Sequence, residues 1–272
     1  MWGILAASLL FLSINRVLAL SLLALSLLMA LYHSVLTLPA AAFLLLTLIA
    51  VLLLKKYRQR KWLAGGLELL LVLAAIALFL HQVPGFNNLK VLDKVNVGPL
   101  SATFSMYYNL DKALVPFILL ACLPTLFVAK KHLSVSRLCW IGLIVSVPAL
   151  LLLAVALGGL KIEMHTPAWI GSFVIANVFF VCLAEEALFR GYLQQRLSQC
   201  LGNYPALLLT ALLFGAAHMA GGPLLMVFAA LAGVIYGLAW LWSGRLWVAV
   251  AFHFGLNLMH LLFFTYPIYS AH

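Results

Sequence analysis

Long apolar runs occupy almost the whole chain and limit its possible folds more than any other feature. A helix needs about 20 apolar residues to cross a bilayer core roughly 30 Å thick. Residues 2–13 form a shorter apolar stretch, which could be a half-span, the start of a long tilted helix or an interfacial segment. Runs of spanning length lie near residues 17–34, 37–54, 63–80, 113–129, 138–160, 170–192, 205–220, 224–242 and 246–266. The sequence therefore predicts an all-α polytopic membrane protein with about 8–10 transmembrane helices.

Charged residues are scarce, at 8% of the 272 residues, whereas 66% are hydrophobic. A soluble domain carries about 25% charged and 45–50% apolar residues. This composition excludes a water-soluble globule, a disordered chain and a nucleic-acid-binding protein, and makes the lipid bilayer the first expected partner. Spanning strands are also excluded, because the runs lack the alternation of polar and apolar residues that a membrane barrel needs.

Most basic residues fall on one side of the predicted spans. Five lie within residues 55–61, and twelve share this side against four on the other. The remaining seven on the first side are Arg16, Lys130, Lys131, Arg137, Arg190, Arg196 and Arg245, and the four on the second are Lys90, Lys94, Lys112 and Lys161. Cytoplasmic loops of membrane proteins carry an excess of Lys and Arg. We therefore expect the loop at 55–61 to be cytoplasmic and the C-terminus to lie outside.

One long stretch, residues 81–112, is rich in turn-forming Pro, Gly and Asn and predicts a loop on the outer face. We expect the acids outside the spans, Asp93, Asp111 and Glu163, to be solvated. Glu68 lies within a predicted span, and we expect it to have a structural role outside any functional site.

The adjacent acids Glu185 and Glu186 lie in the predicted span at 170–192, together with Arg190. Ionisable groups inside a bilayer are costly, so they are functional candidates. Glu186 and Arg190 are four residues apart in the order that favours an ion pair on a helix. Glu185 points about 100° away and remains available as a general base. Alternatively, the acids reach water at a helix end on the cytoplasmic surface.

Two further groups of polar residues lie on the following spans. Phe214 precedes His218 by four residues, and His253 precedes Asn257 by four, which places each pair on one helix face. Each His or Asn alone could simply hydrogen-bond a neighbouring helix. However, Glu185 and these polar residues all lie about 7–13 residues from the predicted cytoplasmic helix ends, or roughly 10–20 Å deep. They could therefore meet in one cavity.

Such a cavity would have defined chemistry. A carboxylate and an imidazole can hold and deprotonate a water molecule. A second imidazole and an amide can stabilise a developing oxyanion. Together these groups could hydrolyse an amide without a covalent intermediate. A zinc site with ligands from several helices is the alternative, although the chain has no His-Glu-x-x-His helix.

The motifs Glu-Glu-x-x-x-Arg, Phe-x-x-x-His and His-x-x-x-Asn, in this order on late helices, resemble the CPBP family. That family includes the type II CAAX prenyl endopeptidase and Abi-type bacterial proteins linked to bacteriocin immunity. The resemblance covers roughly residues 170–270, and all three motifs are complete. The apolar runs predict N-terminal transmembrane helices over 1–165 with an outer-face loop at 81–112, and the resemblance implies a catalytic transmembrane core over 166–272, in the last four helices.

By this resemblance the chain is an intramembrane endopeptidase of glutamic type that needs no cofactor, with a zinc-dependent version as an alternative. Glu185 and His218 would activate water, His253 and Asn257 would form the oxyanion site, and Glu186 with Arg190 would support them. The expected partner is a membrane-associated protein or peptide substrate, such as a CAAX-like protein, a C-terminal sorting segment or a precursor peptide.

The expected location is a bacterial inner membrane, with the active site towards the cytoplasmic side. A non-catalytic immunity or scaffold protein and a proton-relaying transporter are the other functions compatible with these residues. The sequence makes no prediction of the oligomeric state.

Overall fold

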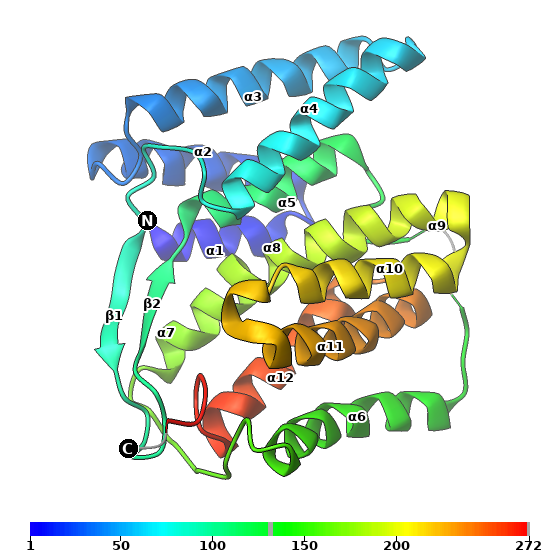
Figure 1. The fold of residues 1–272 in the computed structure, drawn as a ribbon. Coiled ribbons are helices and arrows are strands. Elements are labelled where there is room, and N and C mark those ends of the chain that lie inside the picture. The colour runs from blue at the N-terminus through cyan, green and yellow to red at the C-terminus, as the bar shows by residue number, and fades with distance from the viewer. Residues whose placement is uncertain (130–132, 271–272) are drawn as a thin grey trace.

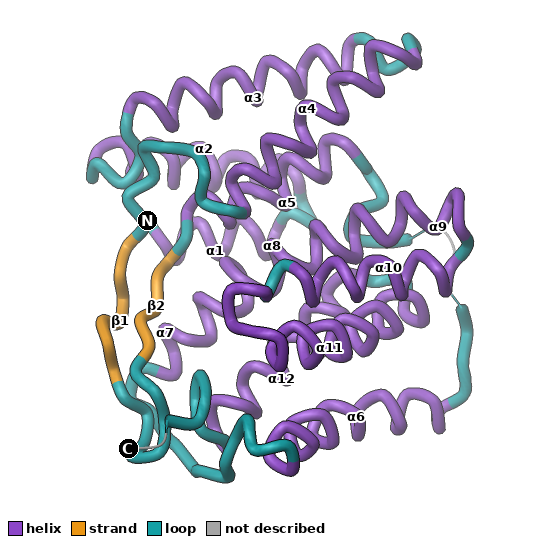
Figure 2. The backbone as a smooth tube through the Cα atoms, in the orientation of Figure 1, coloured by secondary structure: helices purple, strands orange, loops and turns teal. Residues whose placement is uncertain are grey.

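The computed structural model describes residues 1–129 and 133–270, and helices make up most of this part (Figures 1 and 2). It confirms the all-α polytopic class. Lys130 and Lys131, which were assigned to the cytoplasmic side, lie outside the described residues. The N-terminal elements are α1 (Trp2–Phe11), α2 (Arg16–Tyr32), α3 (Leu38–Lys56), α4 (Lys61–Phe79), β1 (Leu89–Val95), β2 (Phe104–Tyr108), α5 (Leu110–Cys122) and α6 (Arg137–Ala156).

The C-terminal part begins with one long apolar helical stretch, residues 170–201. Its segments are α7 (Ile170–Ile175), the π-helical η1 (Ala176–Cys182), α8 (Leu183–Glu186), the π-helical η2 (Ala187–Gln194) and α9 (Gln195–Leu201). The remaining elements are α10 (Asn203–Ala216), the 3-10 turn η3 (Met219–Gly221), α11 (Gly222–Ser243) and α12 (Leu246–Phe263).

Six helices of the described residues are long and apolar enough to cross a membrane, fewer than the eight to ten spans expected. The helices α1, α2 and α10 are apolar but shorter. Helix α1 is a separate short helix, because the chain leaves it after Phe11 and turns into α2. The span expected at 113–129 is also shorter than predicted: α5 ends at Cys122, since Leu123 precedes a proline and adopts an extended conformation.

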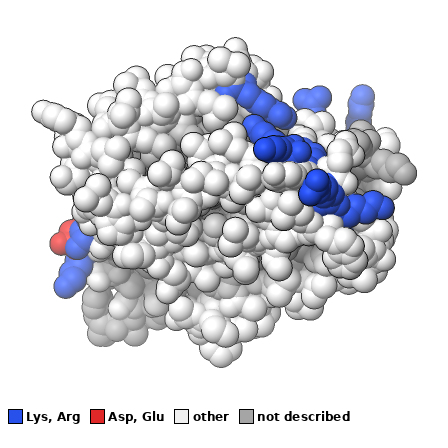
Figure 3. Space-filling model, turned by 90° about the horizontal axis from the view of Figure 1, so that it is seen from above, with Lys and Arg blue, Asp and Glu red and all other residues white. Residues whose placement is uncertain are grey.

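The connections between helices define two opposite faces of the molecule. The hairpin face comprises β1, β2, residues 98–102, the segment 158–169 and the segment 264–270. The bridge Ile162–Phe264 joins the last segment to 158–169, and the bridge Ser101–Tyr269 joins it to 98–102. The basic face comprises the α3–α4 connection and the α11–α12 turn. Lys and Arg side chains gather at this end in Figure 3, while a few charged atoms of both signs are visible at the other.

The hairpin itself is a departure from the sequence prediction, which treated residues 81–112 as a loop. Strands β1 and β2 pair antiparallel, with Leu89 opposite Tyr108 and two irregularities in the register. Asp111, at the start of α5, is 2% exposed and was wrongly expected to be solvated. Its carboxylate accepts a hydrogen bond from Asn88 Nδ2 at 3.0 Å and contacts His81 Nδ1 at 2.6 Å.

Glu163 was also wrongly expected to be solvated. Its carboxylate accepts a hydrogen bond from Ser101 Oγ at 2.6 Å and lies 2.9 Å from His165 Nε2. Burial alone would raise the pKa of the Glu163 carboxyl, but the Ser101 and Leu100 hydrogen bonds and the adjacent His165 lower it overall. Asp93 is largely exposed beside Lys90, as expected for a solvated residue.

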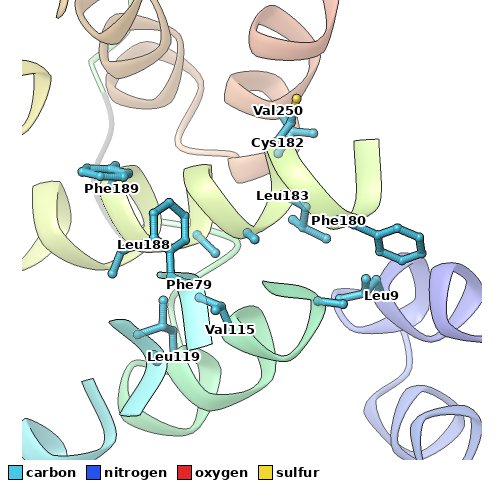
Figure 4. Close-up of a cluster of buried hydrophobic side chains, with 14 of the residues drawn as sticks. Leu9, Phe79, Val115, Leu119, Phe180, Cys182, Leu183, Leu188, Phe189 and Val250 are labelled. Atoms are coloured by element: carbon cyan, nitrogen blue, oxygen red, sulfur yellow. The ribbon is translucent and has the colours of Figure 1, made fainter. Parts of the chain in front are cut away.

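The long stretch 170–201 passes through the centre of the molecule, between α1, α4 and α5 on one side and α12 on the other (Figure 4). Phe189 meets Phe79 of α4 edge-on at 6.1 Å between ring centroids, and Phe180 meets Trp2 at 5.8 Å. One apolar core therefore includes residues from both sides of the predicted boundary at 165. That boundary stays a prediction.

Helices α10 and α11 pack closely because small residues face each other. A Cβ atom added to Gly215 would lie 2.6 Å from the Met226 carbonyl oxygen, and one added to Gly233 would lie 3.0 Å from Ala211 Cα. Small residues permit such close approach between membrane helices. This packing brings α11 against the buried residues of η2.

We predict that Gly215→Leu separates α10 from α11. The expected loss of stability is about 1–3 kcal/mol, typical of overpacking, which lowers the unfolding midpoint by several degrees. Thermal unfolding of the purified protein in detergent measures this change. Gly142→Leu is the control, because a Cβ atom at Gly142 meets nothing within 4 Å. Equal midpoints for the two variants would contradict the close packing.

Candidate active site

The two adjacent acids lie on α8, a single α-helical turn between the π-helical segments η1 and η2. π-helical turns are rare and often occur at functional sites. Glu185 is 7% exposed and Glu186 is fully buried. Because the helix continues to Leu201 and does not end near residue 192, Glu185 lies deeper than the sequence predicted.

Glu186 and Arg190 form the predicted ion pair. Arg190 Nη1 donates to Glu186 Oε1 at 3.0 Å, and both side chains are fully buried. Arg190 Nη2 donates to the Gly233 carbonyl of α11 at 3.0 Å. The guanidinium also lies 4.4 Å from the centre of the Phe214 ring, a cation–π contact. Arg190 thus joins η2, α10 and α11 around Glu186.

His253 of α12 lies between the two carboxylates. Its Nδ1 donates to Glu186 Oε1 at 2.8 Å, while its Nε2 is 4.0 Å from Glu185 Oε2. The imidazole stacks on the Tyr236 ring, with 4.6 Å between centroids and an interplanar angle of 14°. Because the Glu186 carboxylate can only accept a hydrogen bond, the Nδ1 atom of His253 carries a proton. The other ring nitrogen, Nε2, points towards Glu185. The sequence analysis did not identify Tyr236, although a tyrosine within an apolar span was the available signal.

Lys112 of α5 is a second residue that the sequence analysis missed. It was assigned to the outer side with the loop residues. Its ammonium lies 3.6 Å from Glu185 Oε1 and 4.7 Å from the centre of the Phe79 ring. The side chain is only 17% exposed. Besides His253, each buried acid therefore has its own basic partner: Lys112 for Glu185, and Arg190 for Glu186.

His218 follows the C-terminal end of α10. Its Nδ1 donates to the Phe214 carbonyl oxygen at 2.8 Å, so Nε2 is free to accept a proton in the neutral imidazole. The Phe214 ring lies 4.7 Å from the His218 ring and 5.8 Å from the His253 ring, measured between centroids. The motif Phe-x-x-x-His thus has a physical basis: the Phe214 carbonyl orients His218, and the Phe214 ring packs against both histidines.

Asn257 lies one turn after His253 on α12. Its Nδ2 donates to Asn177 Oδ1 at 2.9 Å and lies 3.7 Å from Cys182 Sγ. Its second amide hydrogen is donated to the Cys182 thiol, a weak acceptor that a stronger one can displace. Asn177 was not identified from the sequence; the only available signal was a polar residue in the predicted span 170–192.

A cavity of about 280 Å³ lies between α6, α10, α11, α12 and the segment after α12. Of the predicted site residues, it is lined by His218, His253 and Asn257, together with Phe214 of the motif. The residues Glu185, Glu186 and Arg190 do not line it. The predicted residues therefore form two connected groups, a cavity wall and a buried charge cluster, and His253 belongs to both.

Glu68 lies apart from this site, in agreement with the structural role expected for it. It accepts a hydrogen bond from the Tyr192 hydroxyl at 2.7 Å and forms an ion pair with Arg196. Arg196 was assigned from the sequence to the cytoplasmic loops. This pair joins α4 to the C-terminal end of the central helix.

The described residues include no group of three or more His, Cys, Asp or Glu side chains placed to hold a metal ion. His253 does approach two carboxylates, but one of its nitrogens is hydrogen-bonded to Glu186. The residues as they lie do not form a zinc site of three protein ligands. We therefore derive no step through a metal.

Residues 167–259 match the family model described as Type II CAAX prenyl endopeptidase Rce1-like. This match agrees with the resemblance to the CPBP family, and the matched region contains every motif residue from Glu185 to Asn257. No curated protein and no solved structure matches the chain. The chain is thus an integral multi-pass membrane protein in which the region similar to the Rce1-like family carries the candidate site.

We predict that Arg190→Met lowers the free energy of unfolding by about 3–5 kcal/mol, because Glu186 keeps a buried charge without its main partner. Glu186→Gln combined with Arg190→Met should recover part of this loss. The exposed Arg58→Met is the control and should change stability by less than about 0.5 kcal/mol. Denaturant unfolding in detergent provides the comparison. If the double variant is no more stable than Arg190→Met, the buried ion pair does not control stability.

Proposed function

We propose that the chain is an intramembrane endopeptidase of glutamic type. The observation that carries this proposal is the convergence of His218, His253 and Asn257 on one cavity, with Glu185 beside His253. The family match supports a CAAX-type membrane protease at a coarser level. The polar groups supply what hydrolysis of a peptide bond needs: a proton acceptor and donors to an oxyanion.

Glu185 and His218 are the proposed proton acceptors for the attacking water, and the proton they take would pass to the leaving amine nitrogen as the C–N bond breaks. The gap of 4.0 Å between Glu185 Oε2 and His253 Nε2 is too long for a direct hydrogen bond and has the length that a bridging water spans. The free Nε2 of His218 is a second acceptor at the cavity wall. Lys112 places a positive charge 3.6 Å from Glu185, while Glu186 and Arg190 form an ion pair with each other.

His253 and Asn257 are the proposed donors to the oxyanion. Because Nδ1 of His253 donates to Glu186, His253 would donate to the oxyanion through Nε2, as the doubly protonated imidazolium. His253 is held by its hydrogen bond to Glu186 and by stacking on Tyr236, so its orientation is fixed before the substrate binds. Asn257 is held by Asn177, and its second amide hydrogen would leave the weakly accepting Cys182 thiol for the oxyanion. Donors oriented in advance stabilise developing charge without reorganisation, which is usually a large part of catalysis.

The proposed substrate is a membrane-associated protein or peptide, because the cavity is mostly apolar and the chain is embedded in a bilayer. A CAAX-like protein, a C-terminal sorting segment and a precursor peptide all fit this description. The proposed location is the bacterial inner membrane, with the basic face in the cytoplasm. This orientation rests on the distribution of Lys and Arg side chains (Figure 3).

We predict that Glu185→Gln and His218→Gln each lower the rate of peptide cleavage by about 10²–10⁴-fold, the usual contribution of general acid–base catalysis. The assay uses purified protein with a farnesylated CAAX reporter peptide and an unprenylated membrane-segment reporter. Glu68→Gln is the control, since Glu68 is a partly buried acid outside the site. A metal chelator should leave the rate unchanged.

Two results would contradict this proposal. Full activity of Glu185→Gln would remove the acid from the mechanism, and loss of activity in chelator that added zinc restores would favour a metal enzyme. A non-catalytic immunity or scaffold protein would cleave neither reporter, and its cellular function would tolerate both substitutions.

A further inference from the structure

The cavity has a closed inner end and an open rim. At the inner end, Phe214 and Tyr236 are almost fully buried and His253 is 5% exposed. At the rim, Leu224 is 45% exposed and Ile268 is 55% exposed. Access to the polar groups therefore runs past these apolar rim residues.

The rim lies towards the hairpin face. Leu224 is close to the N-terminal end of α11, Gly159 follows the end of α6, and Ile268 follows the end of α12. These ends all lie opposite the α11–α12 turn, which belongs to the basic face. The sequence analysis expected access from the basic, cytoplasmic side, whereas the rim lies on the opposite side, at the hairpin face.

The hairpin face also shapes the rim. The Ala102 amide donates to the Ile268 carbonyl at 3.1 Å, and the Ser270 amide donates to the Leu100 carbonyl at 3.0 Å. The turn between the two strands therefore holds the segment after α12 at the mouth of the cavity. This gives the predicted loop at 81–112 a role in the geometry of access.

The residues that line the cavity restrict the kind of molecule that can bind in it. Leu, Ala, Gly, Phe, Pro and Ile make up most of the lining, and it includes no Asp, Glu, Lys or Arg from the part of the chain that the structure describes. A charged side chain against this apolar part of the wall would lose its hydration without gaining an oppositely charged carboxylate, Lys or Arg partner among the described lining residues. The volume of about 280 Å³ is near the lower limit of ligand pockets, so a short segment fits and a folded domain does not.

We propose that this cavity binds a short, uncharged, apolar segment of a membrane polypeptide, which enters from the half of the bilayer nearest the hairpin face. The segment lies between α6 and α11 and presents its backbone to His218 and Asn257. The identity of the segment as a substrate rests on the proposed function, whereas its binding and direction of entry do not require cleavage.

Photo-crosslinking tests the occupant. The probe is an N-acetylated leucine tetrapeptide amide with one benzoylphenylalanine, which carries no charge, added to the protein in liposomes. We expect crosslinks to α11 residues 224–232 and to Ile268, and at least about a tenfold weaker signal in Ala232→Phe, which fills the cavity. Leu152→Phe is the control, because Leu152 lies on α6, is 51% exposed and does not line the cavity.

Labelling of Leu225→Cys with a membrane-impermeant maleimide tests the side of entry. The exposed Cys139 and Cys200 are first replaced by Ser, and Asp93→Cys and Arg58→Cys mark the hairpin and basic faces. We expect Leu225→Cys to react from the same side as Asp93→Cys, and the peptide to slow this reaction about fivefold or more.

Three outcomes would overturn the proposal: labelling of Leu225→Cys from the Arg58 side, crosslinks that Ala232→Phe leaves unchanged, or capture of a photoreactive lipid in place of the peptide. Both measurements report binding without cleavage. If the native protein cleaves the reporter but the peptide does not bind at this rim, the proposed direction of entry is wrong and the proposed function stands. If the peptide binds at the rim but the native protein cleaves no reporter, the proposed function is wrong and the binding site stands.

Discussion

Two adjacent carboxylates buried inside a membrane protein are the constraint on which the rest of this structure depends. Glu186 and Arg190 are both fully buried, and neither could remain charged there alone. Their pairing requires η2 to pack against α11, where the Gly233 carbonyl accepts a hydrogen bond from Arg190 Nη2. It also requires α12 to bring His253 to the same carboxylate oxygen. The positions of three helices thus follow from neutralising one acid.

Glu185 extends the same requirement to the N-terminal half of the chain. Its basic partner is Lys112, which α5 supplies. The start of α5 is fixed in turn by the hairpin region, because Asn88 Oδ1 accepts the Leu110 amide hydrogen at 2.8 Å and Asn88 also donates to Asp111. The N-terminal helices are therefore part of the electrostatic environment of the candidate site, although the family match does not include them.

The sequence was sufficient for the features that depend on local patterns. Apolar runs predicted the helices, and the spacing of Glu186 and Arg190 predicted their ion pair, because both depend on neighbours in one helix. The end of α5 at Cys122 was also readable in principle from the following Leu-Pro step. The π-helical segments beside α8 carry no comparable signal, and with the continuation to Leu201 they placed Glu185 deeper than expected.

Contacts between distant segments could not be predicted. Lys112 and Glu185 are far apart in the sequence, and Asn177 meets Asn257 only when α12 packs on η1. Asp111 and Glu163 looked like loop acids, since nothing local reveals the partners that bury them. The opening of the cavity at the hairpin face likewise depends on where three separate elements end.

A double-mutant cycle on Lys112 and Glu185 tests most directly whether the two halves of the chain are joined by this buried pair. The free energy of unfolding in detergent is measured for Lys112→Met, Glu185→Gln and the double variant. The cycle Lys161→Met with Glu185→Gln is the control, because Lys161 does not contact Glu185. We expect a coupling of about 1–3 kcal/mol for Lys112 and near-additive effects for Lys161. Additive effects for Lys112 and Glu185, within about 0.5 kcal/mol, would show that the pair does not join the two halves.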